Sequence, residues 1–305
     1  GAYVDRIDYC PHHPDAGFSG EVPELKINCN CRKPNTGMID AAVVALNIAR
    51  TQSWMIGDSS SDMLTAKRAG LRGILVETGY AGLDHKYLSP PDYVAANLPK
   101  AVDFILHGHP QLLLALDSIA KRIAVGDIVF IGGQSRTGKS TAASGLRELL
   151  QGAGHTCHVL STDCWLLSQD KRTAGVAGRH DMEALNSFIK TLSDRHKDIV
   201  VSMPSYLKGR REQIQNADSL RIAKADTVIV EGVVALSVSA DLKDVQRIVV
   251  TTDEQVRRSR LIREYGLRGE QDQAEAIYEA RMQDEYPWIE ASAKGAMRFE
   301  VSHDH

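Results

Sequence analysis

The stretch "GGQSRTGKST", residues 132–141, decides the fold of the second half of this 305-residue chain. It contains the pattern Gly133-x-x-x-x-Gly138-Lys139-Ser140, in which glycines let backbone amides turn onto phosphate oxygens. The apolar run "DIVFIG" precedes it and the helix-like run "STAASGLRELL" overlaps its end. A strand, a glycine-rich loop and a helix in this order predict a phosphate-binding loop, because the helix N-terminus adds partial positive charge.

The polar residues of this loop predict ATP and Mg²⁺ as cofactors. We expect Lys139 to contact the β- and γ-phosphates, where an ammonium group offsets their charge. We expect the hydroxyl of Ser140 to ligate Mg²⁺, with Thr141 as a second candidate beside it. Gly133 and Gly138 would let the backbone approach the phosphates closely.

Two carboxylates follow apolar strands further along the chain. Asp163 ends the strand in "HVLSTDCWL", where a carboxylate could take the proton from an attacking hydroxyl group. Glu231 ends the apolar strand in "DTVIVEG", and we expect it to hold the Mg²⁺ shell. Together with the loop, the two acids would suit transfer of phosphate to a hydroxyl group.

The segment "RRSRLIREYGLRGE", residues 257–270, contains five arginines. Guanidinium groups suit phosphate oxygens, so we expect a lid that closes over the nucleotide. Arg263 and Arg268 are the candidate lid residues because glycines follow them closely. The alternative is that these arginines form a solvated basic helix face. This alternative fits Arg257 and Arg258 better than it fits Arg263 and Arg268.

The order of apolar and helix-like segments predicts an α/β protein with two domains. The first half is expected to hold helices at residues 40–50 and 62–69 and strands at residues 53–56 and 73–77. The second half is expected to hold strands near residues 127–131, 156–160, 227–230 and 247–250. Strands alternating with helices indicate parallel sheets covered by helices. We expect domains at residues 1–106 and 126–305, joined by a linker helix at residues 107–125.

Four potential metal ligands crowd the start of the chain. The pattern is Cys10-x-His12, then Cys29-x-Cys31 after sixteen residues. Three thiolates and an imidazole make a closed tetrahedral site of the structural zinc type. Such a site would stabilise a loop that lacks secondary structure, because metal binding supplies folding free energy. Chance proximity of cysteines and histidines in a reducing compartment is the alternative.

The composition argues against several classes of partner. A formal net charge of −3 gives no support to nucleic-acid or anionic-membrane binding. The sequence shows no apolar run near the roughly 20 residues that span a bilayer, and no signal-peptide pattern. Five cysteines are too few for a disulfide scaffold. We therefore expect a cytoplasmic protein with no nucleic-acid or membrane partner.

The runs "YCPHHPD", "CNCRKPNTGM" and "MIGDSSSDMLTAKRAG" resemble the histidinol-phosphate and heptose-bisphosphate phosphatase branch of the haloacid dehalogenase superfamily. The resemblance covers about the first hundred residues and implies a partial Rossmann-like unit with a zinc loop. It implies that Lys33 neutralises charge on the transferring phosphoryl group and that Arg32 holds substrate phosphate. Asp58 would ligate Mg²⁺ with support from Asp62, and a phosphorylated sugar would be the ligand. Alternatively, the two aspartates only begin a helix, where acids are favourable.

One part of the family pattern is missing from the sequence. The family attacks phosphorus with an aspartate of a D-x-D-G type motif upstream of the zinc loop, and Asp5 and Asp8 have the wrong spacing for it. We therefore expect no phosphatase turnover from these 305 residues. Because residue 1 is Gly rather than Met, we also expect the chain to be a fragment whose front half carries the nucleophile.

From about Asp127 onward, the runs "GGQSRTGKST", "STDCW", "GRHDMEAL", "MPSYLKGRRE", "IVEGVVAL" and "RLIREYGLRG" resemble the uridine kinase and phosphoribulokinase family. The resemblance implies a P-loop sheet with helices on both faces. It assigns the general base to Asp163, the second acid to Glu231 and the lid to Arg263 and Arg268.

The same resemblance places Asp181, Tyr206 and Arg210 where family members grip the acceptor. The acceptor motifs depart from the family in two places. The run "RHDMEAL" occurs where family members usually have "DHPDAF", and Leu207 follows Tyr206 where an acidic residue is usual. Nucleoside specificity is therefore doubtful, whereas kinase chemistry is expected.

Two function classes follow from these patterns. The first is a bifunctional sugar-phosphate enzyme in which a phosphatase-like unit is fused to a small-molecule kinase. The second is a kinase whose N-terminal unit is only a zinc-stapled binding or scaffolding module. A nucleic-acid-directed ATPase is a distant third, because no basic, aromatic stripe is present.

Overall fold

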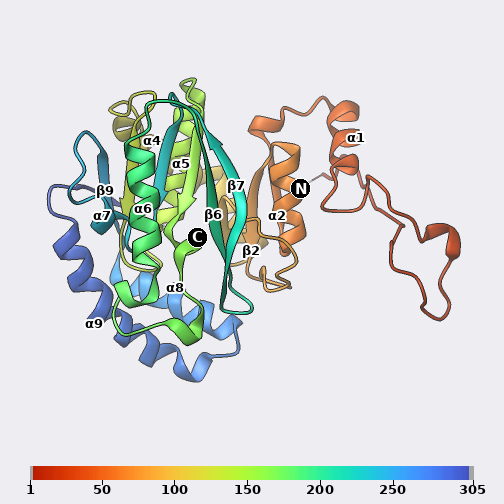
Figure 1. Ribbon diagram of the computed structural model, residues 1–305. Coiled ribbons are helices and arrows are strands. Elements are labelled where there is room, and N and C mark those ends of the chain that lie inside the picture. Colours follow the sequence, from red (N-terminus) through yellow and green to blue (C-terminus); the bar gives the residue numbers. More distant parts are fainter. Residues whose placement is uncertain (1–2, 302–305) are drawn as a thin grey trace. The chain divides into compact units, whose positions relative to one another are not determined.

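The computed structural model describes residues 3–301, and the chain divides into two compact units between Val102 and Asp103. Figure 1 shows the first unit in red to yellow-brown colours and the second from yellow to blue. Each unit contains a parallel sheet with flanking helices, so the predicted α/β class is confirmed.

The first unit contains a three-stranded parallel sheet in the order β1-β2-β3. Its elements are η1 (Pro23–Leu25), α1 (Gly37–Leu46), η2 (Arg50–Gln52), β1 (Trp54–Gly57), α2 (Ser60–Ala69), β2 (Arg72–Val76) and β3 (Tyr93–Ala95). The strand register places Trp54 opposite Arg72 and Ile74 opposite Tyr93. Strand β3 was not expected, because only three residues form it within a proline-rich stretch.

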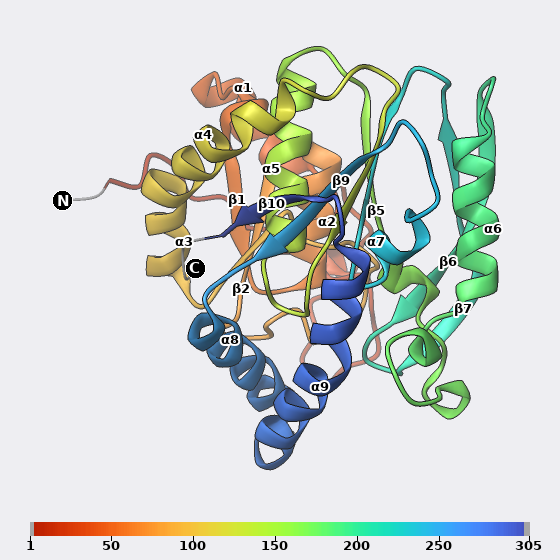
Figure 2. The same cartoon turned by 90° about the vertical axis from the view of Figure 1, so that its left-hand side faces the viewer.

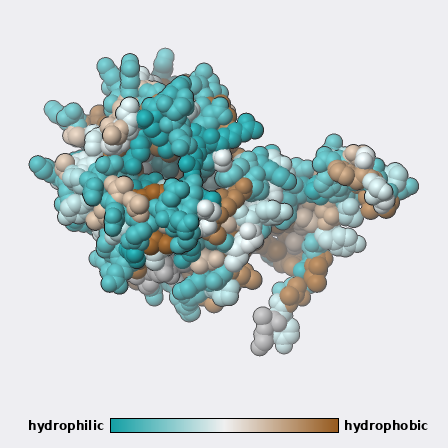
Figure 3. All heavy atoms as spheres, turned by 90° about the horizontal axis from the view of Figure 1, so that it is seen from below, coloured by the Kyte–Doolittle hydropathy of each residue, from teal (hydrophilic) through white to brown (hydrophobic). Residues whose placement is uncertain are grey.

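The first unit buries little apolar surface. Its core centres on residues of α2 and β2 such as Ala66 and Ile74, whereas none of the ten residues of α1 is buried. Its exposed apolar side chains include Ile7 and Val44. Figure 3 shows brown, hydrophobic areas among the hydrophilic surface of the molecule. Because the core is so small, a metal ion bound by loops of this unit would contribute a comparatively large share of its folding free energy.

The second unit contains a five-stranded parallel sheet in the order β10-β9-β4-β8-β5. The strands are β4 (Ile128–Gly132), β5 (Cys157–Ser161), β8 (Thr227–Glu231), β9 (Gln246–Thr251) and β10 (Met297–Glu300). Strands β4 and β8 are buried at every position, as expected for strands covered on both faces. Strand β4 lies between β8 and β9, and ligands of open α/β sheets bind at the carboxyl ends of strands near such a branch point.

Helices cover both faces of this sheet (Figure 2). The helices of this unit are η3 (Phe104–Gly108), α4 (His109–Ala120), α5 (Lys139–Gly152), α6 (Met182–Ser193), α7 (Ala235–Val238), α8 (Glu254–Leu267) and α9 (Ala274–Ser292). Helix α3 (Leu98–Asp103) ends the first unit and crosses the boundary by one residue. Short turns are η4 (Thr162–Trp165), η5 (Gln169–Lys171), η6 (Ala177–Arg179) and η7 (Gln271–Gln273). One core joins Phe130 and Val230 of the sheet to Leu185 of α6 and Ile289 of α9.

The segment expected as a linker helix belongs to the second unit. Helix α4 packs on α5, with Leu112 and Leu116 buried between them. Gly145 of α5 permits this close approach, because a Cβ there would lie 2.9 Å from the Leu116 side chain. Residues 107–125 therefore help to support α5, the helix that follows the phosphate-binding loop.

A two-stranded antiparallel sheet, β6 (Ile199–Leu207) and β7 (Glu212–Ile222), extends from the second unit. Its register shifts between Met203 and Ser205, where Pro204 cannot donate a ladder hydrogen bond. The hairpin carries two of the predicted acceptor residues. Among the described residues, no helix is both long enough and apolar enough to cross a bilayer.

Candidate metal and nucleotide sites

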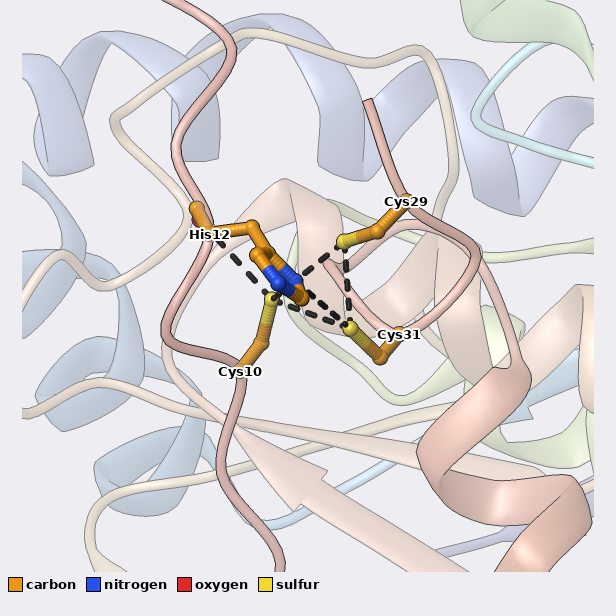
Figure 4. A group of neighbouring side chains, drawn as sticks. All are labelled: Cys10, His12, Cys29 and Cys31. Atoms are coloured by element: carbon orange, nitrogen blue, oxygen red, sulfur yellow. Dashed lines mark hydrogen bonds between the residues drawn. The ribbon is translucent and has the colours of Figure 1, made fainter. Parts of the chain in front are cut away.

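The structure brings Cys10, His12, Cys29 and Cys31 together (Figure 4). The Sγ atom of Cys31 lies 3.3 Å from that of Cys10, 3.1 Å from that of Cys29 and 3.4 Å from Nδ1 of His12. Zinc bonds of about 2.1–2.3 Å place tetrahedral ligands roughly 3.5–3.8 Å apart. The cluster is therefore close to the size of a zinc site.

The donor set also suits a soft divalent cation. The contact with Cys31 lowers the pKa of the Cys29 thiol to about 6, and the same contact raises the pKa of Cys31 to about 12. Three thiols so close together cannot all lose their protons without a compensating charge. A bound cation would supply that charge, and a Cys₃His set is typical of structural zinc.

Hydrogen bonds from side chains to backbone carbonyls stabilise the segment that carries the four potential ligands, residues 10–31, which we call the metal loop. Nη1 of Arg32 donates to the carbonyl of His12 at 2.9 Å, and Nδ2 of Asn35 donates to the carbonyl of Cys29 at 2.8 Å. A Cβ at Gly37 would lie 2.7 Å from the carbonyl oxygen of Asn30, so only glycine fits there. Arg32, the predicted phosphate ligand, thus bonds to the metal loop itself.

The acidic turn after β1 carries the predicted Asp58 and Asp62. Ser59 is the N-cap of α2, and its amide and hydroxyl donate to Oδ2 of Asp62 at 3.1 and 2.7 Å. Nζ of Lys33 lies 2.5 Å from Oδ1 of the same carboxylate. Burial raises the pKa of Asp62, but the hydrogen bonds from Lys33 and Ser59 outweigh it and leave the pKa below its usual value. Asp62 therefore caps the start of α2 and pairs with Lys33.

Asp58 lies at the carboxyl end of β1, where a magnesium ligand is expected. Its Oδ2 atom accepts a hydrogen bond of 2.8 Å from the amide of Tyr80. Gly79 has a φ of +65°, and a Cβ there would collide with the Asp58 carboxylate. This turn therefore fixes one carboxylate oxygen.

The phosphate-binding loop runs from the end of β4 to the start of α5. Gly133 has a φ of +153° and Gly138 a φ of +94°, so both positions require glycine. Lys139 is only 9% exposed, and its Nζ atom donates to the carbonyl of Gln134 at 2.8 Å. Ser140 is exposed at the helix start, and Thr141 is half-buried. The loop has the shape that a phosphate cradle requires.

The two predicted acids end neighbouring strands beside this loop. Strand β5 pairs with β8 so that Ser161 lies opposite Glu231, and Asp163 follows two residues later. Burial and the charge of Asp163 raise the pKa of Glu231, while Lys139 opposes this shift. Burial lowers the pKa of Lys139 against the charges of Glu231, Glu285 and Asp163. Three carboxylates thus favour the charged form of this buried lysine.

The predicted acceptor residues have structural partners. Asp181 is the N-cap of α6 and accepts from the amide of Ala184 at 3.0 Å. The hydroxyl of Tyr206 accepts a hydrogen bond of 2.5 Å from Arg172, whose guanidinium also lies over the ring. Arg210 is exposed at the tip of the β6–β7 hairpin.

Sequence reasoning missed His180, which is only 6% exposed. Its Nδ1 atom bonds to the carbonyl of Val176 at 3.0 Å, and its buried Nε2 atom has no hydrogen-bond partner among the described residues. Asp163 influences its pKa, although burial dominates and lowers it. A buried polar atom without a partner is uncommon, and it suits a bound polar group.

Two arginines of α8 other than the predicted lid residues bond to the phosphate-binding loop. Nη1 of Arg257 donates to the carbonyl of Ser135 at 3.4 Å, and Nη1 of Arg260 to the carbonyl of Arg136 at 3.3 Å. Arg257 is fully buried, so the solvated-face alternative for this residue is wrong. Arg268 pairs with Glu264, which also pairs with Arg136 of the loop. Arg263 is half-buried on the same helix.

Two family models match the chain. Residues 30–101 match the HAD-hydrolase-like model, and residues 129–278 match the model of an AAA domain. The first match includes Cys31 and the acidic turn, and the second includes the phosphate-binding loop and α8. The chain therefore joins a HAD-like unit to a P-loop unit.

Curated relatives match the N-terminal part. The D-glycero-beta-D-manno-heptose-1,7-bisphosphate 7-phosphatase of Haemophilus ducreyi is 44% identical over 82 residues, which are 27% of this chain and 42% of the relative. The D-glycero-D-manno-heptose-1,7-bisphosphate 7-phosphatase of Thermosynechococcus vestitus is 36% identical over 111 residues, 34% of this chain and 55% of the relative. The chain spans about half the length of these relatives. The predicted resemblance to heptose-bisphosphate phosphatases is confirmed.

Solved structures match the larger part of the chain. A possible uridine kinase from Bacillus stearothermophilus has a TM-score of 0.43 and 20% identity, over 62% of this chain and 99% of that one. The D-glycerate 3-kinase of Cryptococcus neoformans has a TM-score of 0.45 and 12% identity, over 64% and 96%.

Proposed function

We propose that the second unit is an ATP-dependent kinase that phosphorylates a hydroxyl group of a small molecule of the sugar or nucleoside type. The observation that carries this proposal is the charge arrangement at the carboxyl edge of the sheet. There, β4 leads into the phosphate-binding loop and Lys139, Glu231 ends the adjacent strand β8, and Asp163 follows β5 on the other side of β8. A phosphate-binding loop without an acid near the acceptor side would suit nucleotide binding alone.

The predicted site residues of the second unit would have separate roles in phosphoryl transfer. The loop amides and Lys139 would bind the phosphates and stabilise charge in the transition state. Asp163 would accept the proton of the attacking hydroxyl. Ser140 and Glu231 would hold Mg²⁺, which supplies positive charge at the phosphate oxygens. Arg263 and Arg268 would contribute once the α8–α9 segment closes.

The acceptor would bind on the side of η4, α6 and the β6–β7 hairpin. His180 supports this placement, because its unpartnered Nε2 is buried near Asp163. With Nδ1 donating to the Val176 carbonyl, Nε2 is an acceptor, so it suits a hydroxyl group of a polyol. Asp181, Tyr206 and Arg210 would complete this side of the site.

For the first unit, we propose a zinc-stapled site that binds a phosphorylated sugar and, as part of a bifunctional enzyme, serves its dephosphorylation. The support is the match to heptose-bisphosphate phosphatases together with the ion pair between Lys33 and Asp62 of the acidic turn, which also carries Asp58. A non-catalytic scaffolding role is the second candidate. It is favoured by the direct pairing of Lys33 with Asp62, which gives both residues a structural use.

A screen of ATP consumption tests the kinase proposal. The full chain, with Mg²⁺, is assayed against phosphorylated sugars, free sugars and nucleosides, with Lys139→Ala as the matched control. We expect acceptor-dependent ADP formation that the control lacks. Failure of the unaltered chain to bind any nucleoside triphosphate would overturn the proposal.

A separate titration tests the first unit. A heptose bisphosphate should bind the full chain, and Lys33→Ala should weaken that binding. Binding that is unaffected by Lys33→Ala would favour the scaffolding role over the phosphatase-like one.

A further inference from the structure

A fully buried carboxylate of α9 contacts the phosphate-binding loop directly. Oε2 of Glu285 accepts the backbone N–H of Ser135 at 2.7 Å, and Oε1 accepts the Ser135 hydroxyl at 2.8 Å. Glu285 is 0% exposed and lies 150 positions further along the chain. A bidentate bond of this kind fixes both the backbone and the side chain of one loop residue.

Two arginines compensate the buried charge. Nη1 of Arg281, one turn earlier in α9, lies 2.8 Å from Oε1 of Glu285 and 2.7 Å from the Ser135 hydroxyl. Nη2 of Arg179 lies 3.6 Å from the same Oε1 atom. Burial raises the pKa of Glu285, but Arg281 and Ser135 outweigh it and keep the carboxyl ionised. One negative charge is thus shared by two cations beside the loop.

Other hydrogen bonds engage two carbonyls in the first half of the loop. The carbonyl of Gln134 accepts from Nζ of Lys139 at 2.8 Å and from the hydroxyl of Thr137 at 2.9 Å. The carbonyl of Ser135 accepts from Arg257. Together with the bonds of Ser135 to Glu285, these contacts anchor the first half of the loop. Further along the loop, the amide of Thr137 donates to the carbonyl of Gln134 at 3.4 Å.

We propose that Glu285 is a positioning residue that holds the phosphate-binding loop in its nucleotide-binding shape through Ser135. The inference deepens the proposed function and rests on it. Any rearrangement of the loop would leave a buried carboxylate short of partners, which is costly. The loop is therefore preorganised by α9, a helix that lies outside the strand–loop–helix motif, and less binding free energy is spent on ordering it.

Nucleotide titration tests this role on the full chain, with ATP and Mg²⁺ as the probe. Glu285→Gln should weaken ATP binding by roughly 10–100-fold, the factor expected for loss of hydrogen bonds to a charged group. The KM for ATP should rise while kcat at saturating ATP stays nearly constant, because the loop is shaped before chemistry. Glu290→Gln is the control on the same helix, since Glu290 is exposed and pairs only loosely with Arg298. It should leave the ATP affinity unchanged.

A second variant keeps the test decisive if Glu285→Gln folds poorly. Ser135→Ala removes the hydroxyl bond alone, and it should also raise the dissociation constant for ATP. In the double variant the increase should be smaller than the product of the two single factors, because both changes remove one interaction. Independent, multiplicative effects or an unchanged affinity in both single variants would overturn the positioning role.

The outcomes also separate this inference from the kinase proposal. If Lys139→Ala abolishes ATP binding but Glu285→Gln and Ser135→Ala do not weaken it, the loop binds nucleotide without help from Glu285. If the unaltered chain binds no ATP, the proposed function fails first and the inference fails with it.

Discussion

Nζ of Lys33 lies 2.5 Å from Oδ1 of Asp62, so an ion pair connects the chain just after the metal loop to the first turn of α2. The Asp62 side chain is 4% exposed, whereas that of Lys33 is 43% exposed. The same carboxylate accepts two bonds from Ser59. The metal loop, the acidic turn and the helix start are therefore one connected structure, and disturbance of one part should reach the others.

Asp62 should give the first unit an acid-labile contribution to stability. Its pKa is lowered in the folded state, so its stabilisation is complete above about pH 4, the range of an unfolded aspartate. The contribution is lost as the pH falls through the lowered folded pKa. The free energy of unfolding, measured from about pH 7 down to about pH 2, should show this loss. In Asp62→Asn, the free energy of unfolding should depend less on pH over this range. The exposed Asp15→Asn variant should not change the acid limb, and an identical limb in Asp62→Asn would refute the assignment.

The metal cluster should contain one zinc ion per chain. Metal analysis of the purified protein should detect it, and chelation should lower the unfolding temperature of the first unit because metal binding supplies folding free energy. Cys29→Ser should remove the metal. Cys164→Ser, which alters a cysteine outside the cluster, should retain it. Protein without zinc whose stability is unaffected by chelator would contradict this.

Gly79 should be more sensitive to substitution than Gly70. Both have a positive φ, so alanine costs roughly 1–2 kcal/mol of backbone strain at either position. Only at Gly79 would the new Cβ also collide with the carboxylate of Asp58, whereas Gly70 faces open space. Chemical denaturation should therefore show a larger loss for Gly79→Ala than for Gly70→Ala. Equal losses would mean that the turn does not fix the Asp58 carboxylate.

Much of the fold could be predicted from apolar runs and glycines. Strands β4 and β8 are nearly continuous apolar segments, and β5 and β9 contain shorter apolar runs. All four lie close to the predicted positions. The β6–β7 hairpin was not predicted, because β7 (Glu212–Ile222) is mostly exposed and polar and carries no alternating pattern. Strand β10 is short and follows a turn at Gly295, so its four residues give little signal.

Site residues could be predicted where they lie close together in the sequence. They could not be predicted where the contacts join residues far apart in the sequence. The phosphate-binding loop and the metal ligands lie in short motifs with informative spacing. Glu285 contacts Ser135 across 150 positions, and in sequence it is one acid among several in a polar helix. Burial of Arg257 was equally hidden, because a basic helix face gives no sign that Ser135 and Met282 cover it.

The most direct test of the kinase assignment compares Asp163→Asn with Lys139→Ala in two assays, ATP titration and phosphoryl transfer. Asp163→Asn keeps the size of the side chain and removes its charge. It should leave ATP binding nearly intact and reduce transfer by roughly 10²–10⁴-fold, the usual range for loss of a general base. Lys139→Ala should impair both, because its ammonium group meets the phosphates in the bound and transition states. If Asp163→Asn instead abolishes ATP binding, Asp163 belongs to the metal shell and the assignment of the base to this residue is contradicted.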